Sequence, residues 1–234
     1  MNEDTDFELY LSISPAEYTI YLYDIKNLKN FYKKNFKLEQ EQNFIDFKVL
    51  NNFIEKNIFK IEKLIGKFVR NISLIIENDE IINIELGVKK KNYEQNISQK
   101  IIENTLFEIK DLFNENFNDY RIMHLILKNY LVNENRYPSY KENLIGDNFC
   151  LEVQIISIPL KLIFEIDKVM QNFHIKPNYY LSLQYVRKFC KDEGIELSNI
   201  AYKLQNGSNS NEVKLIPKKL KKLGFFEKFF QLFS

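Results

Sequence analysis

The alternation of strand-like and helix-like hydrophobic patterns constrains the fold of this chain more than any single motif does. Apolar and polar side chains alternate in residues 7–13, and the same period of two returns in residues 18–23 and 31–38. In residues 44–68 the apolar side chains instead recur at helical spacing, which predicts a long amphipathic helix. Strands followed by such a helix can bury a shared apolar face, so a sheet covered by helices is expected.

The remainder of the chain continues this alternation. Strand 121–132 is apolar on both faces, so we expect it to lie in the centre of a sheet. The predicted fold class is α+β, a mixed sheet covered by helices. The other predicted elements are a hairpin of strands 71–76 and 81–88, a helix over 97–113, a strand at 151–158, a helix over 160–173, a strand at 179–183 and a helix over 184–197.

Composition excludes several classes of protein. The 33 basic and 32 acidic side chains nearly cancel, so no overall field attracts nucleic acid and no nucleic-acid partner is expected. Cys150 and Cys190 lie too far apart for a zinc motif and are typical of a reduced intracellular protein. The acidic N-terminus differs from a secretory signal, and no apolar run reaches the roughly 18–20 residues of a spanning helix. We therefore expect a cytoplasmic protein that is at most peripheral to a membrane.

The segment 218–234 carries the strongest functional signal. On a helix its apolar side chains fall on one side and its polar ones on the other, behind a basic approach. Five lysines and one glutamate give the segment a charge of +4, in a chain whose net charge is +1. Such a helix lies in a membrane interface and is attracted to anionic lipid. The predicted membrane-binding residues are Leu223, Phe225, Phe226, Phe229, Phe230, Leu232 and Phe233, with Lys218, Lys219, Lys221, Lys222 and Lys228.

The same helical pattern has two other interpretations. A terminal helix can dock on the core of its own chain, or it can bind the groove of a partner protein. The preceding segment, 205–212, is rich in Asn, Ser and Gly and is typical of a flexible tether. A tether favours a tail that works away from the core.

No group of side chains indicates catalysis, a cofactor or a metal. His124 lies in a predicted strand, far from His174, and is expected to be a structural histidine. Gly146 is expected to serve a turn, and the lysines at 89–91 to form the solvated end of a strand. The carboxylates expected to lie on the surface are Glu55, Glu62 and Glu77.

The order of these elements, and the segment 121–157 in particular, resembles the bacterial cell-division protein FtsA, a family of actin-like ATPases. The landmarks are His124 in a strand, Tyr130, Asn133, the Asn-Leu-Ile-Gly loop at 143–146 and the strand at 151–156. The C-terminal helix also resembles the membrane-targeting sequence of that family. The resemblance implies a vestigial actin-like hairpin in 1–40, an inserted α+β domain in 41–200, a flexible tether in 201–217 and a membrane-targeting helix in 218–234.

The sequence departs from that family where the family binds nucleotide. The first hairpin reads Leu-Ser-Ile-Ser-Pro at 11–15, without the Asp and Gly of the family's phosphate loop. The second Gly-rich phosphate loop is absent, and the second actin-like half is missing after Leu183. With these departures the resemblance implies that the protein has no cofactor and is not an enzyme.

The resemblance implies a membrane-attached adaptor of the division machinery on the inner face of the cell membrane. Its expected partners are anionic lipids of the inner membrane and other division proteins, and self-association is left open. Contact with the ring protein FtsZ is in doubt, because the family makes it mainly through the missing half. The alternatives are an adaptor of a pilus or secretion assembly, and a soluble interaction domain whose terminal helix binds a partner groove.

Overall fold

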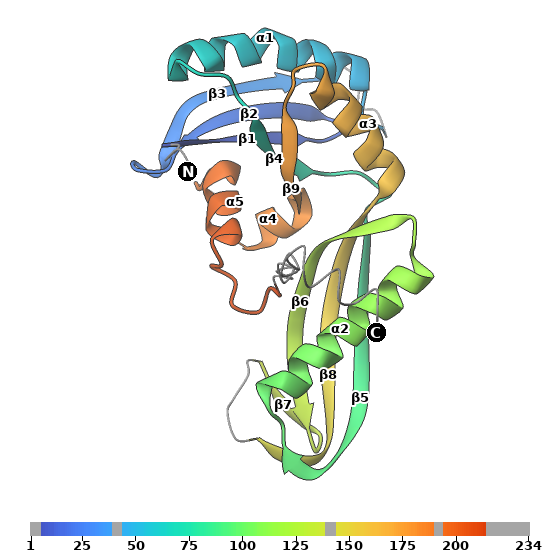
Figure 1. Ribbon diagram of the computed structural model, residues 1–234. Helices are drawn as coiled ribbons and strands as arrows, with labels where there is room; N and C mark the ends of the chain where they lie inside the picture. The colour runs from blue at the N-terminus through green and yellow to red at the C-terminus, as the bar shows by residue number, and fades with distance from the viewer. Residues whose placement is uncertain (1–5, 39–43, 139–143, 190–193, 214–234) are drawn as a thin grey trace, which may run out of the picture.

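The chain folds around two β-sheets joined end to end (Figure 1). The computed structural model describes residues 6–38, 44–138, 144–189 and 194–213. Sheet A has the strand order β3-β2-β1-β4-β9, and sheet B has the order β5-β8-β6-β7. The strands of sheet A are β1 (Phe7–Ile13), β2 (Glu17–Asp24), β3 (Lys29–Lys37), β4 (Asn71–Ile76) and β9 (Lys176–Ser182). Those of sheet B are β5 (Ile82–Asn96), β6 (Tyr120–Val132), β7 (Asn135–Tyr137) and β8 (Ile145–Pro159).

Sheet A combines an antiparallel meander with two parallel strands. β1 pairs with β2, and β2 with β3, in antiparallel register, whereas β4 runs parallel to both β1 and β9. Two helices, α1 (Phe47–Ile65) and α3 (Leu160–Gln171), cover one face of this sheet. The opposite face is covered by α4 (Leu183–Phe189) and α5 (Leu197–Gln205). Sheet A is therefore the middle layer of three.

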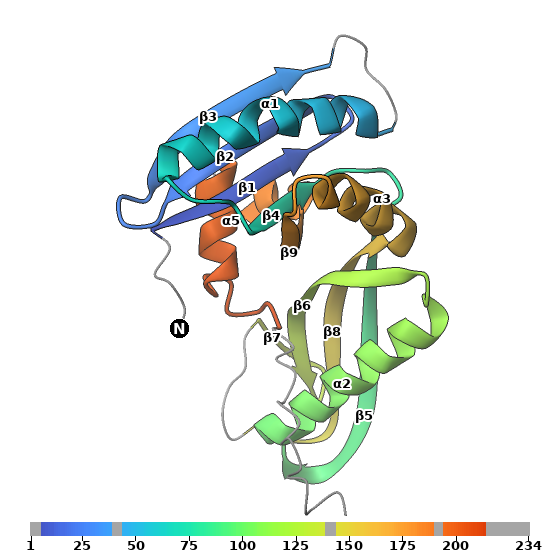
Figure 2. The same ribbon diagram turned by 45° about the horizontal axis from the view of Figure 1, so that its top comes forward.

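Helix α1 forms where the helical periodicity of the sequence predicts a helix, and the residues at both of its ends favour that structure. It begins where the side chain of Asp46 accepts hydrogen bonds from the backbone N–H groups of Lys48 and Val49. It ends at Gly66, whose φ of 69° is the left-handed conformation that glycine adopts without strain. The apolar side chains on one side of α1 pack on sheet A, and the helix lies over that face of the sheet (Figure 2). The buried residues of the helix are Leu50, Phe53, Ile54, Asn57, Ile58 and Ile61.

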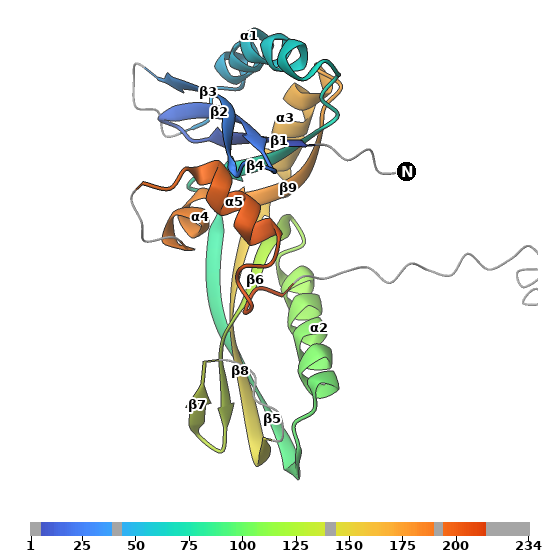
Figure 3. The same ribbon diagram turned by 90° about the vertical axis from the view of Figure 1, so that its left-hand side faces the viewer.

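Sheet B is inserted between β4 and α3 of the layered unit that contains sheet A. Helix α2 (Gln99–Asn116) covers one face of it and buries a separate core of Ile, Leu, Val and Phe side chains. Seen from the side, none of the helices in the described ranges covers the opposite face of sheet B (Figure 3). None of the helices that the structure describes is long and apolar enough to cross a membrane.

The α+β fold class is confirmed, but the sheet assignment needs correction. Strands 71–76 and 81–88 were expected to form a hairpin, whereas β4 pairs with β1 and β9 in sheet A and β5 pairs with β8 in sheet B. The physical reason is burial, because five consecutive residues of β4 are buried and such a strand needs neighbours on both sides. The turn at 77–80 therefore leads from one sheet to the other.

The predicted domain limits also differ from how the strands pair. A separate hairpin domain was expected in 1–40. Instead β1, β2 and β3 form one sheet with β4 and β9, which come from the range 41–200. Because residues 9–13 of β1 are all buried, that strand requires a partner on each edge. The inserted unit is β5 to β8, and β4, α3 and β9 on either side of it belong with sheet A. Of the helix expected over 184–197, α4 occupies the first part, whereas α5 begins at Leu197, where the expected helix ends.

Candidate functional site

A cleft lies where the two sheets meet. The parallel strands β1, β4 and β9 end in register, with Ile13 beside Ile76 and Ile76 beside Ser182. The carboxyl ends of parallel strands are a common place for binding sites. Here a cleft of about 650 Å³ opens beyond β4 and β9, with α4 contributing one wall and β5, β6 and β8 of sheet B contributing the other. Its polar lining includes Glu77, Gln184 and Lys188.

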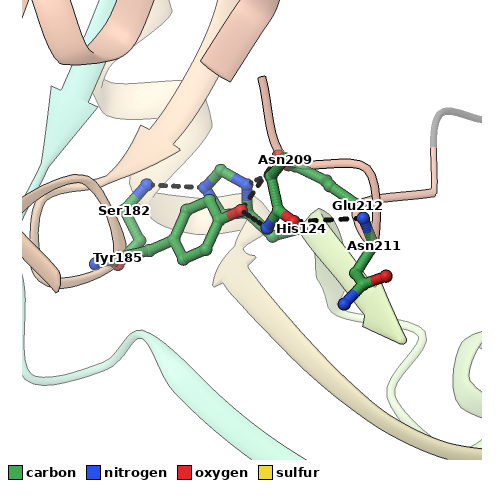
Figure 4. Close-up of polar contacts among 6 residues, drawn as sticks. All are labelled: His124, Ser182, Tyr185, Asn209, Asn211 and Glu212. Carbon is green, nitrogen blue, oxygen red and sulfur yellow. Dashed lines mark hydrogen bonds and ion pairs between the residues drawn. The ribbon is translucent and has the colours of Figure 1, made fainter. Parts of the chain in front are cut away.

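A buried histidine joins the two sheets beside this cleft (Figure 4). The side chain of His124 on β6 is fully buried, and its Nε2 accepts a hydrogen bond of 3.0 Å from the backbone N–H of Ser182 on β9. Its Nδ1 lies 2.6 Å from Oε1 of Glu212. Because the N–H of Ser182 can only donate, Nε2 carries the lone pair and the proton lies on Nδ1, from which it is donated to Glu212. Both ring nitrogens are thereby satisfied, as expected of a structural histidine.

Tyr185 of α4 completes this arrangement. Its hydroxyl donates to Oε2 of Glu212 at 3.0 Å and accepts from Nδ2 of Asn209 at 2.7 Å. Its ring packs against the imidazole of His124, with the ring centroids 4.3 Å apart. Burial raises the pKa of Tyr185 well above its ordinary value, and the negative charge of Glu212 raises it further against the opposing effect of Asn209. The hydroxyl therefore stays a donor. We call His124, Ser182, Tyr185, Asn209 and Glu212 the His124 cluster.

The segment that follows α5 is held against sheet B. The N–H of Leu127 donates to the carbonyl of Asn211, and the N–H of Val213 donates to that of Leu125, each at 2.8 Å. Ile126 and Glu212 form an antiparallel bridge. We call residues 206–213 the strap. It lies on a part of the β6 edge that β7 leaves unpaired, since β7 pairs only with residues 130–132.

The prediction of a flexible tether over 205–212, within the wider range 201–217, is therefore wrong for the residues that the structure describes. Residues up to Gln205 belong to α5, and the strap is hydrogen-bonded to β6 and to the His124 cluster. Its Asn side chains, which predicted mobility, instead make specific contacts, such as that of Asn209 with Tyr185. Composition alone did not reveal this, because the partners of the strap on β6 lie more than 80 residues earlier in the chain, and Tyr185 lies 24 residues before Asn209.

The turn of the first hairpin bears on nucleotide binding. Ser14 closes this turn by itself, because its backbone N–H and its hydroxyl both donate to the carbonyl of Glu17. The hydroxyl oxygen also accepts from the N–H of Glu17 at 3.0 Å. A phosphate cradle requires backbone N–H groups that are free to face the ligand. The N–H groups of Ser14 and Glu17 are already used within the turn.

The other residues singled out in the sequence have structural surroundings. Gly146 was expected in a turn but lies inside β8. A side chain does not fit there, because a Cβ would come within 2.4 Å of Cγ1 of Val132. Lysines 89–91 lie inside β5 rather than beyond its end. Glu55 is exposed, and Glu77 lies 3.6 Å from the guanidinium of Arg187. The carboxylate of Glu62 accepts from the N–H of Val69.

Several predicted residues cannot be placed. The predicted membrane-binding residues between Lys218 and Phe233 all lie outside the described residues, as does Cys190. Cys150 is a half-buried free thiol, and burial raises its pKa. No group of three or more His, Cys, Asp or Glu side chains in the described ranges could hold a metal ion.

Comparison with known proteins gives matches only to solved structures. No family model matches the chain, and no curated protein matches it. The PilM–PilN type IV pilus biogenesis complex contains a chain with a TM-score of 0.51 and 8% sequence identity, over 79% of this chain and 49% of that one. The cytoplasmic domain of EpsL, an inner-membrane component of the Vibrio cholerae type II secretion system, gives a TM-score of 0.36 at 7% identity, over 75% and 54% of the two chains.

A third match is a protein from Bacteroides thetaiotaomicron with an actin-like ATPase fold and unknown function, at a TM-score of 0.35 and 10% identity, covering 79% of this chain and 55% of that one. The chain thus spans about half the length of the structures it matches. Of these three, only the likeness to the pilus complex has a TM-score above 0.5, and it shows a shared fold. The first two neighbours belong to pilus and secretion assemblies, and the expected FtsA is not one of the three.

Proposed function

We propose that this protein is a non-enzymatic, actin-like adaptor of a pilus or secretion assembly, held on the inner face of the cell membrane by its C-terminal helix. The observation that carries the proposal is the fold shared with the pilus complex over 79% of the chain. That solved structure is a complex of PilM with PilN, so the neighbour is a protein that binds another protein. The proposal replaces cell division with envelope assembly as the first interpretation.

The closed turn of the first hairpin supports an adaptor rather than an ATPase. Ser14 and Glu17 use their backbone N–H groups within the turn, and neither the Asp nor the Gly of a phosphate loop occurs there. An adaptor needs surfaces for partners and an attachment to the membrane, and it needs no nucleotide. The apolar and basic residues of 218–234 would supply that attachment.

We place the binding site for a partner protein in the cleft between the sheets. It is concave, and its walls come from both sheets, so a bound segment would contact both at once. Its exposed rim includes Lys188 of α4, while Lys128 of β6 and Glu85 of β5 lie on the opposite wall. Charges of both signs suit a polar segment of a protein partner.

Site-specific photo-cross-linking in growing cells tests this function. A photoreactive residue in place of Lys188 lies in the cleft, and one in place of Lys56, exposed on α1, is the matched control. We expect position 188, and not position 56, to capture an inner-membrane protein of a pilus or secretion assembly. Capture of division proteins at position 188 would contradict the proposal in favour of a division adaptor. Equal capture at both positions would contradict the placement of the site.

A further inference from the structure

The outer edge of β5 is a long strand edge that nothing in the described part of the chain covers. β5 spans Ile82–Asn96 and pairs only with β8, so its other side faces solvent (Figure 1). An open edge presents unpaired N–H and C=O groups and is a template for another strand. Proteins usually protect such an edge against pairing with other chains, so an unprotected edge indicates a candidate site of association.

The other sheet edges that the structure describes are protected. β3 carries four lysines in nine residues, and pairing it with another copy would bring like charges together. β7 is only three residues long. β9 contains Pro177, and the N–H of Ser182 at its end is bound to His124. β5 also carries three lysines and is irregular after Lys91, so an additional strand fits best on its residues 82–91, where Glu85 can balance the charge of Lys89.

The sequence of β5 alternates in a way that favours such pairing. Ile84, Leu86 and Val88 are half-buried against α2, whereas Glu85, Gly87 and Lys89 are exposed on the opposite face. A strand added to this edge would extend both the apolar face and the charged face. The only described ion pair of Glu85 is with Lys128, a contact of 3.9 Å between exposed side chains, so Glu85 can pair with another chain.

The strand is complementary to itself in one antiparallel register. When Gly87 lies opposite Gly87 of a second copy, Glu85 lies opposite Lys89 and Leu86 lies opposite Val88. Twofold symmetry repeats each of these pairs. Cross-strand pairs of opposite charge stabilise an antiparallel ladder. Lys90 points to the other face and is bound by Glu108 of α2, which leaves it outside the charged pairing.

We propose that two copies of this chain associate through antiparallel pairing of their β5 edges, so that the two four-stranded sheets B form one continuous sheet. The charge pairs between Glu85 and Lys89 set the register. A single pair of strands buries less surface than a stable interface of about 1,200–2,000 Å², so the association is transient and depends on concentration. This association does not rest on the proposed function.

Sedimentation analysis of the full-length protein across a range of concentrations tests the proposal. The variants are Glu85→Lys, Lys89→Glu and the double exchange E85K/K89E. Each single variant places like charges opposite each other twice, so we expect its dimer dissociation constant to rise about tenfold or more. The double variant restores opposite charges and should return close to the wild-type constant.

Two controls keep the outcomes distinct. Lys34→Glu makes the same charge change as Lys89→Glu on the edge of β3 and should leave association unchanged. Circular dichroism shows whether each variant is folded. A wild-type protein that stays monomeric at about 100 µM would overturn the proposal. So would association that is equally strong in folded single and double variants, because the dimer would then form elsewhere, for example through residues 218–234.

Discussion

At the level of single residues, Gly146 shows how closely the two strands at the far end of sheet B approach each other. A Cβ at this position would lie 2.4 Å from Cγ1 of Val132 and 3.1 Å from Oδ1 of Asn133. Asn133 itself has a φ of 46°, and its Oδ1 accepts from the N–H groups of Asp147 and Asn148. The glycine is therefore required by side chains of the neighbouring strand, and its sequence context suggested a turn because that neighbour is not visible locally.

We predict that Gly146→Ala lowers the free energy of unfolding by about 1–3 kcal/mol, because the methyl group overpacks against Val132. Denaturant unfolding measures the change. Gly194→Ala is the matched control, because nothing lies within 4 Å of a Cβ there. Equal stability of the two variants would show that β8 and β6 are not packed as described.

At the level of elements, the sequence predicts whether a segment forms a helix or a strand better than it predicts which strands pair with each other. The helix over 44–68 and the strands at 7–13 and 121–132 follow from local periodicity, and the structure has α1, β1 and β6 there. The separation of β4 and β5 into two sheets does not follow, because it depends on β1, β8 and β9, which lie far away in sequence. The strap was missed for the same reason.

Glu212 is the residue that holds the strap in place. We predict that Glu212→Ala costs about 1–3 kcal/mol of stability, because Nδ1–H of His124 and the hydroxyl of Tyr185 lose their acceptor in a buried place. Hydrogen exchange should also accelerate at the amides of Leu127 and Val213, which the strap orders.

The control for this variant is Glu196→Ala. Glu196 is paired with Lys33 at 2.7 Å, but both side chains are more than 40% exposed. Such a surface pair contributes about 0–1 kcal/mol, so the control should change stability little and should leave exchange at Leu127 unaltered. If both variants behave alike, the strap is not fixed by the His124 cluster.

At the level of the whole molecule, sheet A, the inserted sheet B and the strap meet at one junction. β9 and α4 contribute Ser182 and Tyr185, β6 contributes His124, and the last described residues contribute Glu212. The cleft lies beside this junction, and the segment 218–234 begins within a few residues of it. A protein attached to a membrane through that segment would therefore be held close to its cleft, which suits an adaptor that meets a membrane-embedded partner.

Candidate functions were only partly accessible from the sequence. The α+β class was accessible, because it follows from local hydrophobic periodicity, and the fold is shared with the pilus complex although the sequence identity is only 8%. The choice between division and envelope assembly was not accessible, because it depends on partners that leave no local pattern. The His124 cluster was equally hidden, since its members lie up to 88 residues apart in the chain.

The measurement that tests the account most directly is co-sedimentation of the full-length protein with liposomes of anionic and neutral lipid, at low and high salt. The matched variant is F226E/F230E, which removes two apolar groups from the predicted membrane face. We predict that the wild-type protein pellets with anionic liposomes, that salt weakens its binding, and that the folded double variant stays in solution. Equal pelleting of both proteins, or of neither, would contradict a membrane-attached adaptor.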